Sequence, residues 1–410
     1  MSNQLHARKK PVGSGNLGSF DATEDPSNKG KLKGAAQTIP ASIGILAIAL
    51  FLFYSLWRTR AEATQDNIPS VPRFGTSSGH SYVTVVMPSV VNPSGRSTRL
   101  DTIASTWGPL SHAIFVLHNV SEFQQAPHLA LNVQTFPQTL LVPPEISVHD
   151  GLNRMNHVIR TVFQQVNPDF AFFVNDHTYV ISDHVCSYLH DKSPDQHMYE
   201  GHALKNENDA FNSGAAGYFL SRMTMQGLVQ KWDEGNAECL AKSNGKSNWL
   251  QGNPGLVTAT CLAKEMGVNT VDTRDKGSHR FHAFGLVGTV AGKVDEWYIN
   301  KHDNLKDIAG FDDSYAIVPA GEHCCSKETI SFHYVEYSEA KALFHVRQEL
   351  LDRPSITDAE LKEIVIKEWP KDWKLLGGYS KPLPKDEDQT SWAALITVLR
   401  NISSRMRVAC

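Results

Sequence analysis

The sequence predicts an α/β domain built on a mostly parallel sheet, and two patterns indicate this. Short apolar segments of strand length alternate with a segment of clear helical period, and turn residues separate them. Strands that alternate with helices, without an internal repeat, are typical of parallel sheets joined by helical crossovers. The chain has 410 residues, enough for one large domain or two ordinary ones.

The expected strands are runs of apolar, β-branched and aromatic residues. They are Tyr82–Met87, Ala113–Leu117, Thr139–Val142, Phe170–Val174 and Met198–Leu204. The clearest helix is Gly151–Val166, whose apolar residues recur on one face. After about residue 345 the pattern becomes helical. The segment Thr357–Glu360 reads as a capping box that opens a helix through about Trp369, and a last short helix follows around 395–399.

The N-terminal region predicts a membrane anchor. Residues 1–38 form a polar tail expected to be disordered, 39–57 carry no charge, and 58–80 read as a flexible stem. Nineteen residues are just long enough to cross a hydrocarbon core of about 30 Å. Lys and Arg predominate before this stretch, which predicts a cytoplasmic N-terminus and a lumenal domain. A buried core helix is the alternative for 39–57.

A lumenal location agrees with two glycosylation sequons, at Asn119 and Asn401. A short anchor suits the thinner membranes of the endoplasmic reticulum and Golgi. The formal net charge of −4 gives no indication of nucleic-acid binding. Six cysteines are expected to be oxidised there, and the adjacent Cys324 and Cys325 are expected to bond to separate partners.

The segment Asn175-Asp176-His177 follows the apolar run that ends at Val174. Polar side chains at the end of a buried strand lie at the edge of a sheet, where open α/β sheets bind ligands. Asp176 and His177 are of types that can hold a divalent cation. The alternative is a strand that simply ends in a turn.

Four further segments stand in a characteristic order. They are Thr106–Gly108, Asn212–Arg222, Asp272–Phe284 and Cys324–Val335. Together with the Asn175–His177 segment they resemble the β1,3-galactosyltransferase and Fringe superfamily, from about residue 82 to 340. The paired cysteines ahead of Ser331-Phe332-His333-Tyr334-Val335 point to the core 1 β1,3-galactosyltransferase branch.

The resemblance implies a GT-A fold over residues 81–345, followed by a helical extension over 346–410. It implies a Golgi type II membrane enzyme that transfers galactose from UDP-galactose in β1,3 linkage to a glycoprotein or glycan acceptor, such as O-linked GalNAc. It also implies Mn²⁺ as cofactor and inversion at the anomeric carbon, which requires a general base. Homo-oligomerisation is left open.

Carried over residue by residue, Asn175-Asp176-His177 takes the place of the family's Asp-Asp-Asp metal motif. His282 matches the histidine that completes the metal site, so Asp176, His177 and His282 are the expected ligands, with Asn175 beside the substrate. The resemblance also places Gly214, Ala215 and Gly217 along the substrate pocket. Trp107 and His333 are further candidates for substrate contact, with core packing and a structural hydrogen bond as their respective alternatives. Finally, the resemblance pairs Cys239 with Cys261.

Two departures from the family pattern matter. The metal motif loses its two outer carboxylates, which predicts weaker metal binding, with a further loss below about pH 6.5 as imidazole gains a proton. The acidic pair that supplies the family's base is replaced by Pro254-Gly255. The nearest upstream acids are Asp233, Glu234 and Glu238, and the catalytic base is therefore unknown. A catalytically inactive member that binds an enzyme or a glycan is the alternative function.

Overall fold

The computed structural model describes residues 80–89, 95–118, 138–206, 209–240, 254–293, 319–371 and 381–404, with short pieces between 295 and 315. Within them, a six-stranded sheet has the order β3-β2-β1-β4-β9-β6. Its strands are β1 Tyr82–Met87, β2 Ala113–Leu117, β3 Gln138–Leu141, β4 Phe170–Asn175, β6 Tyr199–Gly201 and β9 Tyr218–Ser221. The first four run parallel, and β9 is antiparallel to β4 and β6. This mixed α/β architecture is consistent with the expected GT-A fold.

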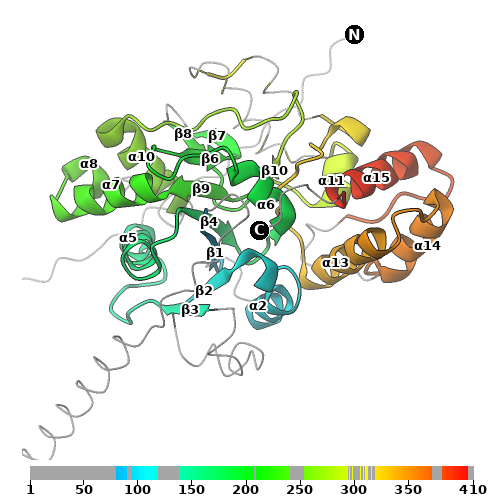
Figure 1. Ribbon diagram of the computed structural model, residues 1–410, viewed down its shortest axis with the longest axis horizontal. Helices are drawn as coiled ribbons and strands as arrows, with labels where there is room; N and C mark the ends of the chain where they lie inside the picture. Colours follow the sequence, from blue (N-terminus) through cyan, green and yellow to red (C-terminus); the bar gives the residue numbers. More distant parts are fainter. Residues whose placement is uncertain are drawn as a thin grey trace, which may run out of the picture. The chain divides into compact units, whose positions relative to one another are not determined.

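The sheet is buried on both faces, because alternate residues of its strands belong to two different cores. In β4, Phe170, Phe172 and Val174 face one core, while Ala171 and Phe173 face the other. This period of two places successive side chains on opposite faces. Figure 1 shows helices gathered on either side of the strands.

The core that contains Phe172 is covered by helices from both ends of the domain: α2 Arg96–Ser105, α6 Ser182–Leu189, α13 Tyr337–Asp352, α14 Asp358–Glu368 and α15 Gln389–Ile402. The opposite core is covered by α5 Gly151–Thr161, α7 Arg222–Asp233 and α10 Pro254–Met266, with α8 Ala237–Leu240 beside them. The C-terminal helices therefore share a core with the sheet. Helix α13 runs through residue 345, where the sequence placed the end of the transferase domain.

Two smaller sheets complete the described strands. One has the order β10-β11-β5, from β10 Phe281–His282, β11 Ser331–Phe332 and β5 Tyr179–Val180. The other joins β7 Ala203–Asn206 to β8 Asp209–Asn212. The first of these sheets brings together three segments that lie far apart in the chain. The remaining described elements are short: α11 Leu286–Val290 and helical turns at 109–111, 162–166 and 321–323.

The strand predictions are confirmed except at Met198–Leu204. That segment forms two strands, β6 and β7, which belong to different sheets and are separated by His202. The helix predicted over Gly151–Val166 is confirmed as α5 followed by a wider π-helical turn from Val162 to Val166. The capping box at Thr357 is present, since Thr357 Oγ1 accepts from the Glu360 backbone N–H at 3.2 Å.

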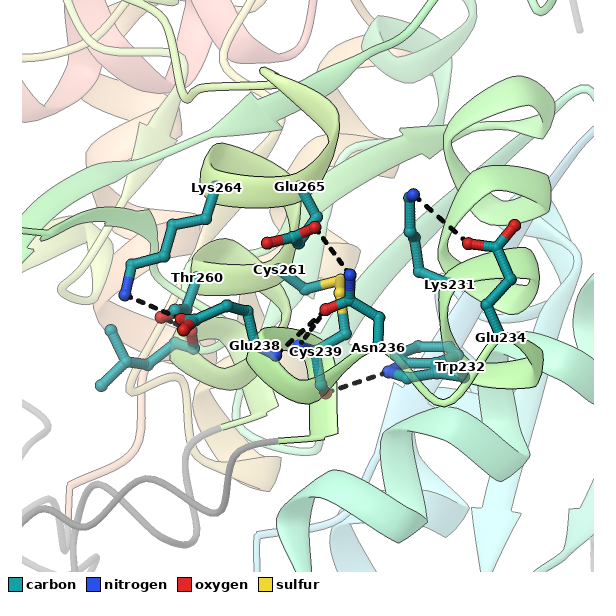
Figure 2. The surroundings of a disulfide bond; sticks show 11 residues. Lys231, Trp232, Glu234, Asn236, Glu238, Cys239, Thr260, Cys261, Lys264 and Glu265 are labelled. Carbon is teal, nitrogen blue, oxygen red and sulfur yellow. Dashed lines mark hydrogen bonds and ion pairs between the residues drawn. A yellow bond between two sulfur atoms is a disulfide. The ribbon is translucent and has the colours of Figure 1, made fainter.

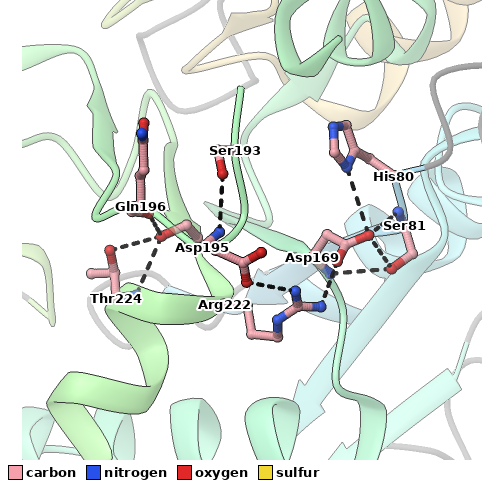
Figure 3. A network of polar contacts seen from close by, with 9 residues as sticks. His80, Ser81, Asp169, Ser193, Asp195, Gln196, Arg222 and Thr224 are labelled. Carbon is pink, nitrogen blue, oxygen red and sulfur yellow. Dashed lines mark hydrogen bonds and ion pairs between the residues drawn. The ribbon is translucent and has the colours of Figure 1, made fainter. Parts of the chain in front are cut away.

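A polar network fixes the amino-terminal ends of β1 and β4 (Figure 3). The Asp169 carboxylate accepts the Ser81 backbone N–H at 2.8 Å and the Arg222 guanidinium at 2.6 Å. Arg222 also reaches Asp195 at 2.8 Å. This network lies at the opposite edge of the sheet from the predicted site, so it anchors strands and the start of α7.

The disulfide between Cys239 and Cys261 is confirmed and joins α8 to α10 (Figure 2). The expectation for the adjacent cysteines is wrong, because Cys324 and Cys325 form a disulfide with each other. The two cysteines are consecutive in the chain, and their Cα atoms lie 3.7 Å apart. Cys186 is also disulfide-bonded.

Several predictions lie outside the described residues: the tail 1–38, the anchor 39–57, all but the last residue of the stem 58–80, and the sequon at Asn119. Among the described helices, none is long and apolar enough to span a bilayer. Asn401 lies half-buried in the last turn of α15, and the hydroxyl-bearing residue of its sequon, Ser403, is buried.

Candidate functional site

The predicted site lies where the strand order of the sheet reverses. From β1 the chain proceeds outward through β2 to β3, and β4 then returns to pair with the other side of β1. The carboxyl ends of β1 and β4 lie side by side, with Met87 opposite Asn175. Such a switch point opens a crevice in which α/β proteins bind ligands. Asn175 is the last residue of β4, and Asp176 and His177 follow it at this edge of the sheet.

Asp176 is held by protein groups on both of its carboxylate oxygens. Oδ1 accepts the Ser89 backbone N–H at 2.8 Å, and Oδ2 accepts the Arg99 Nε–H at 2.9 Å. The side chains of Arg99 and Asp176 are 3% and 0% exposed. A buried ion pair is strongly favoured over either charge alone, because each partner would otherwise be desolvated without compensation.

His177 faces a second buried carboxylate, which the sequence analysis missed. Its Nδ1 lies 3.4 Å from Oε1 of Glu336, and both side chains are 6% exposed. Glu336 occupies the N-cap position of α13 but does not cap the helix with its side chain. The Val335 backbone N–H donates to the His177 carbonyl at 2.9 Å, which fixes the two segments together. Glu336 directly follows the motif that contains His333.

Asn175 and His333 form a hydrogen-bonded pair. Asn175 Nδ2 donates to His333 Nε2 at 3.1 Å, so the proton of the imidazole lies on Nδ1, which faces the Ala283 carbonyl at 3.3 Å. Asn175 Oδ1 accepts the His177 backbone N–H at 2.9 Å. Burial, and then the neighbouring His177, lowers the pKa of His333 to about 3. His333 is therefore neutral. Its contacts with Asn175 and Ala283 are those of a structural histidine, which was the alternative to substrate contact.

His282 belongs to the same small sheet as the segment after Asp176, but β11 lies between them. Neighbouring strands are about 4.8 Å apart, so the backbones of β5 and β10 are separated by roughly 10 Å. The His282 ring stacks on Phe332 of β11 at 4.6 Å between ring centroids. Burial, and then His202, lowers its pKa to about 3.

These residues do not fit the predicted manganese site. Among the described residues, no three His, Cys, Asp or Glu side chains lie close enough together to hold a metal ion. The Asp176 carboxylate is filled by Ser89 and Arg99, and the ligand set of Asp176, His177 and His282 is not assembled. The segments that precede and follow these residues share one small sheet, and an ion held jointly by Asp176, His177 and His282 stays a prediction without support from the described contacts.

The glycine turn lies against the end of β4. Thr178 Oγ1 donates to the Ala215 carbonyl at 2.6 Å, and Gly214 and Ala215 are half-buried. Gly217 is buried with φ of +96°, and a Cβ there would meet the Phe172 ring. Substrate contact by this turn stays a prediction. The positive φ of Gly217 and its close packing against Phe172 already account for a glycine at this position.

Trp107 is 1% exposed and belongs to the hydrophobic core that contains Phe172. This agrees with the core-packing alternative for Trp107, and the described structure offers no surface through which its ring could contact a substrate.

The acids nearest to the replaced base motif are all engaged at the surface. Asp233 pairs with Arg160 at 2.8 Å, Glu234 with Lys231 at 3.3 Å and Glu238 with Lys264 at 3.0 Å. Figure 2 shows Glu234 and Glu238 around the Cys239–Cys261 disulfide. Pro254 and Gly255 form the first turn of α10. These contacts give no reason to assign the role of catalytic base to any of the three acids. The carboxylate that lies beside the predicted site residue His177 is that of Glu336.

No protein-family model matches the chain. It is 27% identical over 191 residues to glycoprotein-N-acetylgalactosamine 3-beta-galactosyltransferase 1 of Xenopus laevis, a match that covers 44% of this chain and 46% of that protein. The matched region therefore spans less than half of the length of this curated relative. Together with the ordered segments and the α/β architecture, this distant match supports membership of the chain in the core 1 β1,3-galactosyltransferase family.

Proposed function

We propose that this protein is a glycosyltransferase that transfers a hexose from a UDP-sugar, with galactose from UDP-galactose as the first choice, in β1,3 linkage to a glycan acceptor. The observation that carries the proposal is the placement of the segments at the switch point. The Asn175–His177 loop, the Gly214–Gly217 turn and the His333–Glu336 segment meet there, although the sequence separates them widely. We further propose a type II orientation in a Golgi membrane, with residues 39–57 as the anchor.

Inverting transfer requires one protein group to take the acceptor proton. The acceptor oxygen attacks the anomeric carbon as the bond from that carbon to the diphosphate oxygen breaks, and UDP leaves with the bonding electrons. We assign the proton to the Glu336 carboxylate, which is held in place by His177 at 3.4 Å. A general base of this kind contributes about 10²–10⁴ in rate.

The test is turnover of UDP-galactose by the full-length chain in detergent, with GalNAc-bearing glycopeptides as acceptors. Glu336→Gln keeps the shape of the side chain and removes its basicity, so kcat should fall by about 10²–10⁴ while the affinity for UDP stays unchanged. Glu322→Gln is the matched control, since that side chain is 58% exposed in a surface turn. Unchanged kcat in Glu336→Gln would exclude Glu336 as the base.

A second candidate is a family member that binds a UDP-sugar or glycan without transferring it. The specific observation in its favour is that the family's acidic pair is replaced by the first turn of α10, and that the upstream acids are paired at the surface. UDP binding measured by calorimetry, together with no turnover of any UDP-sugar on any acceptor, would establish this function instead. Absence of UDP binding, of glycan binding and of turnover would contradict both candidates.

A further inference from the structure

Cys186 lies in the middle of α6 and takes part in a disulfide. Its side chain is 1% exposed and belongs to the hydrophobic core that also contains Val346 of α13 and Ile402 of α15. The four cysteines of the two disulfides described above are already bonded to one another. The sequence contains six cysteines, so elimination leaves Cys410 as the partner of Cys186 within this chain.

The face of α6 that carries Cys186 is turned toward the end of α15. Asp183 and Cys186 lie three residues apart, and residues at this spacing share one face of a helix. The Arg347 guanidinium of α13 donates to the Asp183 carboxylate at 3.4 Å and to the Ile402 carbonyl at 3.1 Å. Ile402 is the last residue of α15. Arg347 therefore joins α6 to the point from which the sequence continues to Cys410.

A second contact places the residues after α15 beside α6. Burial is the largest influence on the pKa of His184 and lowers it, and the backbone of Ser404 is among the groups that raise it. This influence requires the Ser404 backbone to lie close to the His184 ring, two residues before Cys186. Cys410 lies six positions after Ser404, and an extended chain of that length spans about 20 Å. The segment is therefore long enough for Cys410 to reach Cys186.

We propose that Cys186 and Cys410 form an intrachain disulfide that fastens the C-terminal end of the chain to α6. The Sγ–Sγ bond forms as each thiol loses one proton and the pair gives up two electrons. These pass by thiol–disulfide exchange to the disulfide of an oxidoreductase, which is reduced to a dithiol. Two cysteines joined by a short tether meet at an effective concentration in the millimolar range, which favours this bond over one between two copies. The oxidation rests on the proposed lumenal location, whereas the choice of partner does not.

The disulfide bears on the candidate site through the helices that it joins. Helix α6 follows the His177 loop through β5, and α13 begins directly after Glu336. Arg347 already connects these two helices with α15 by hydrogen bonds. A bond from Cys186 to Cys410 adds a covalent connection to the same group of helices, and the C-terminal extension becomes a fixed part of the domain.

The experiment is peptide mapping by mass spectrometry of the full-length protein, made in a secretory host, purified in detergent and alkylated before it is unfolded. Trypsin should release the peptide Thr161–Lys192 linked to Val408–Cys410, and reduction should separate the two. In Cys410→Ser, Cys186 should react with iodoacetamide in denaturant without reductant, whereas in the control Ala409→Ser it should stay blocked. Cys410→Ser should also unfold about 5 °C below the wild type, because opening a long loop frees the unfolded chain, and the control should not.

The outcomes separate the inference from the proposed function. Cys186 that is bonded elsewhere, that stays blocked in Cys410→Ser, or that is a thiol while the other two disulfides are intact would overturn the inference and leave the transferase proposal standing. A disulfide-linked dimer that Cys410→Ser abolishes would also overturn it, because the bond would join two copies. Six free thiols would overturn it together with the lumenal location. The linked peptides without turnover of any UDP-sugar would support the disulfide and contradict the transferase proposal alone.

Discussion

Replacing Gly217 tests why the Gly214–Gly217 turn contains glycine at this position. The reason is either close packing against Phe172 or close approach of a ligand. The φ of Gly217, +96°, is one that a residue with a side chain rarely adopts, and an added Cβ would lie 2.6 Å from both Cε2 and Cζ of Phe172. The Phe172 ring cannot easily move, because it stacks on Phe219 at 4.2 Å between ring centroids. The added methyl therefore meets both backbone strain and an immobile neighbour.

The magnitude for Gly217→Ala follows from these two contributions. Positive φ costs about 1–2 kcal/mol, and overpacking a well-filled core costs about 1–3 kcal/mol. The variant should therefore lower the free energy of unfolding by about 2–5 kcal/mol. Gly235→Ala is the matched control, because Gly235 has φ of +67° and nothing lies within 4 Å of the point that a Cβ would occupy there. Only the backbone contribution of about 1–2 kcal/mol remains in that variant.

Urea unfolding of the full-length protein in detergent, followed by tryptophan fluorescence, measures both variants against the wild type. The difference between them isolates the contact with Phe172, since both share the positive φ. If Gly217→Ala is destabilised no more than Gly235→Ala, the packing reason for Gly217 is refuted. The turn would then owe its glycine to substrate access, as the sequence suggested.

Two further predictions concern stability. Replacing Cys239 and Cys261 by serine releases a loop with a sequence separation of 22, which should lower the free energy of unfolding by about 3 kcal/mol in non-reducing urea titrations. A loss below about 1 kcal/mol would contradict the loop-entropy reasoning. Burial lowers the pKa of His202 to about 4 in the folded state, so the unfolded chain binds the extra proton and stability falls as pH drops from 6.5 towards 4. In His202→Gln the slope of unfolding free energy against pH should be smaller by about 1.4 kcal/mol per pH unit across that window. An unchanged slope would contradict the lowered pKa of His202.

The fold was predictable where one local pattern determines it. The strand β2 is a continuous apolar run, and β1 is one that only Thr84 interrupts. Polar or turn residues flank both strands, so their bounds follow from the sequence. The segment Met198–Leu204 has the same local pattern, but pairing with different sheets divides it, and pairing depends on the whole topology. The adjacent Cys324 and Cys325 likewise depend on local backbone geometry that spacing does not reveal.

The candidate site shows the same division between local pattern and long-range contact. The position of Asn175, Asp176 and His177 at the end of a buried strand follows from the sequence, because hydrophobic burial ends there. Their partners do not, since Arg99 is 77 residues away from Asp176 and many other cations precede it. Glu336 had a usable signal, as an acid that directly follows the motif containing His333.

In this chain the three residues at the position of the family's acidic metal motif are engaged with protein partners. Each of the three consecutive side chains has a specific buried partner: Asn175 has His333, Asp176 has Arg99, and His177 has Glu336. A site that had merely decayed would not be expected to keep two buried carboxylates, because each is costly unless it is paired. Asp176 therefore contributes to one buried ion pair, with Arg99, and His177 to a contact with the Glu336 carboxylate.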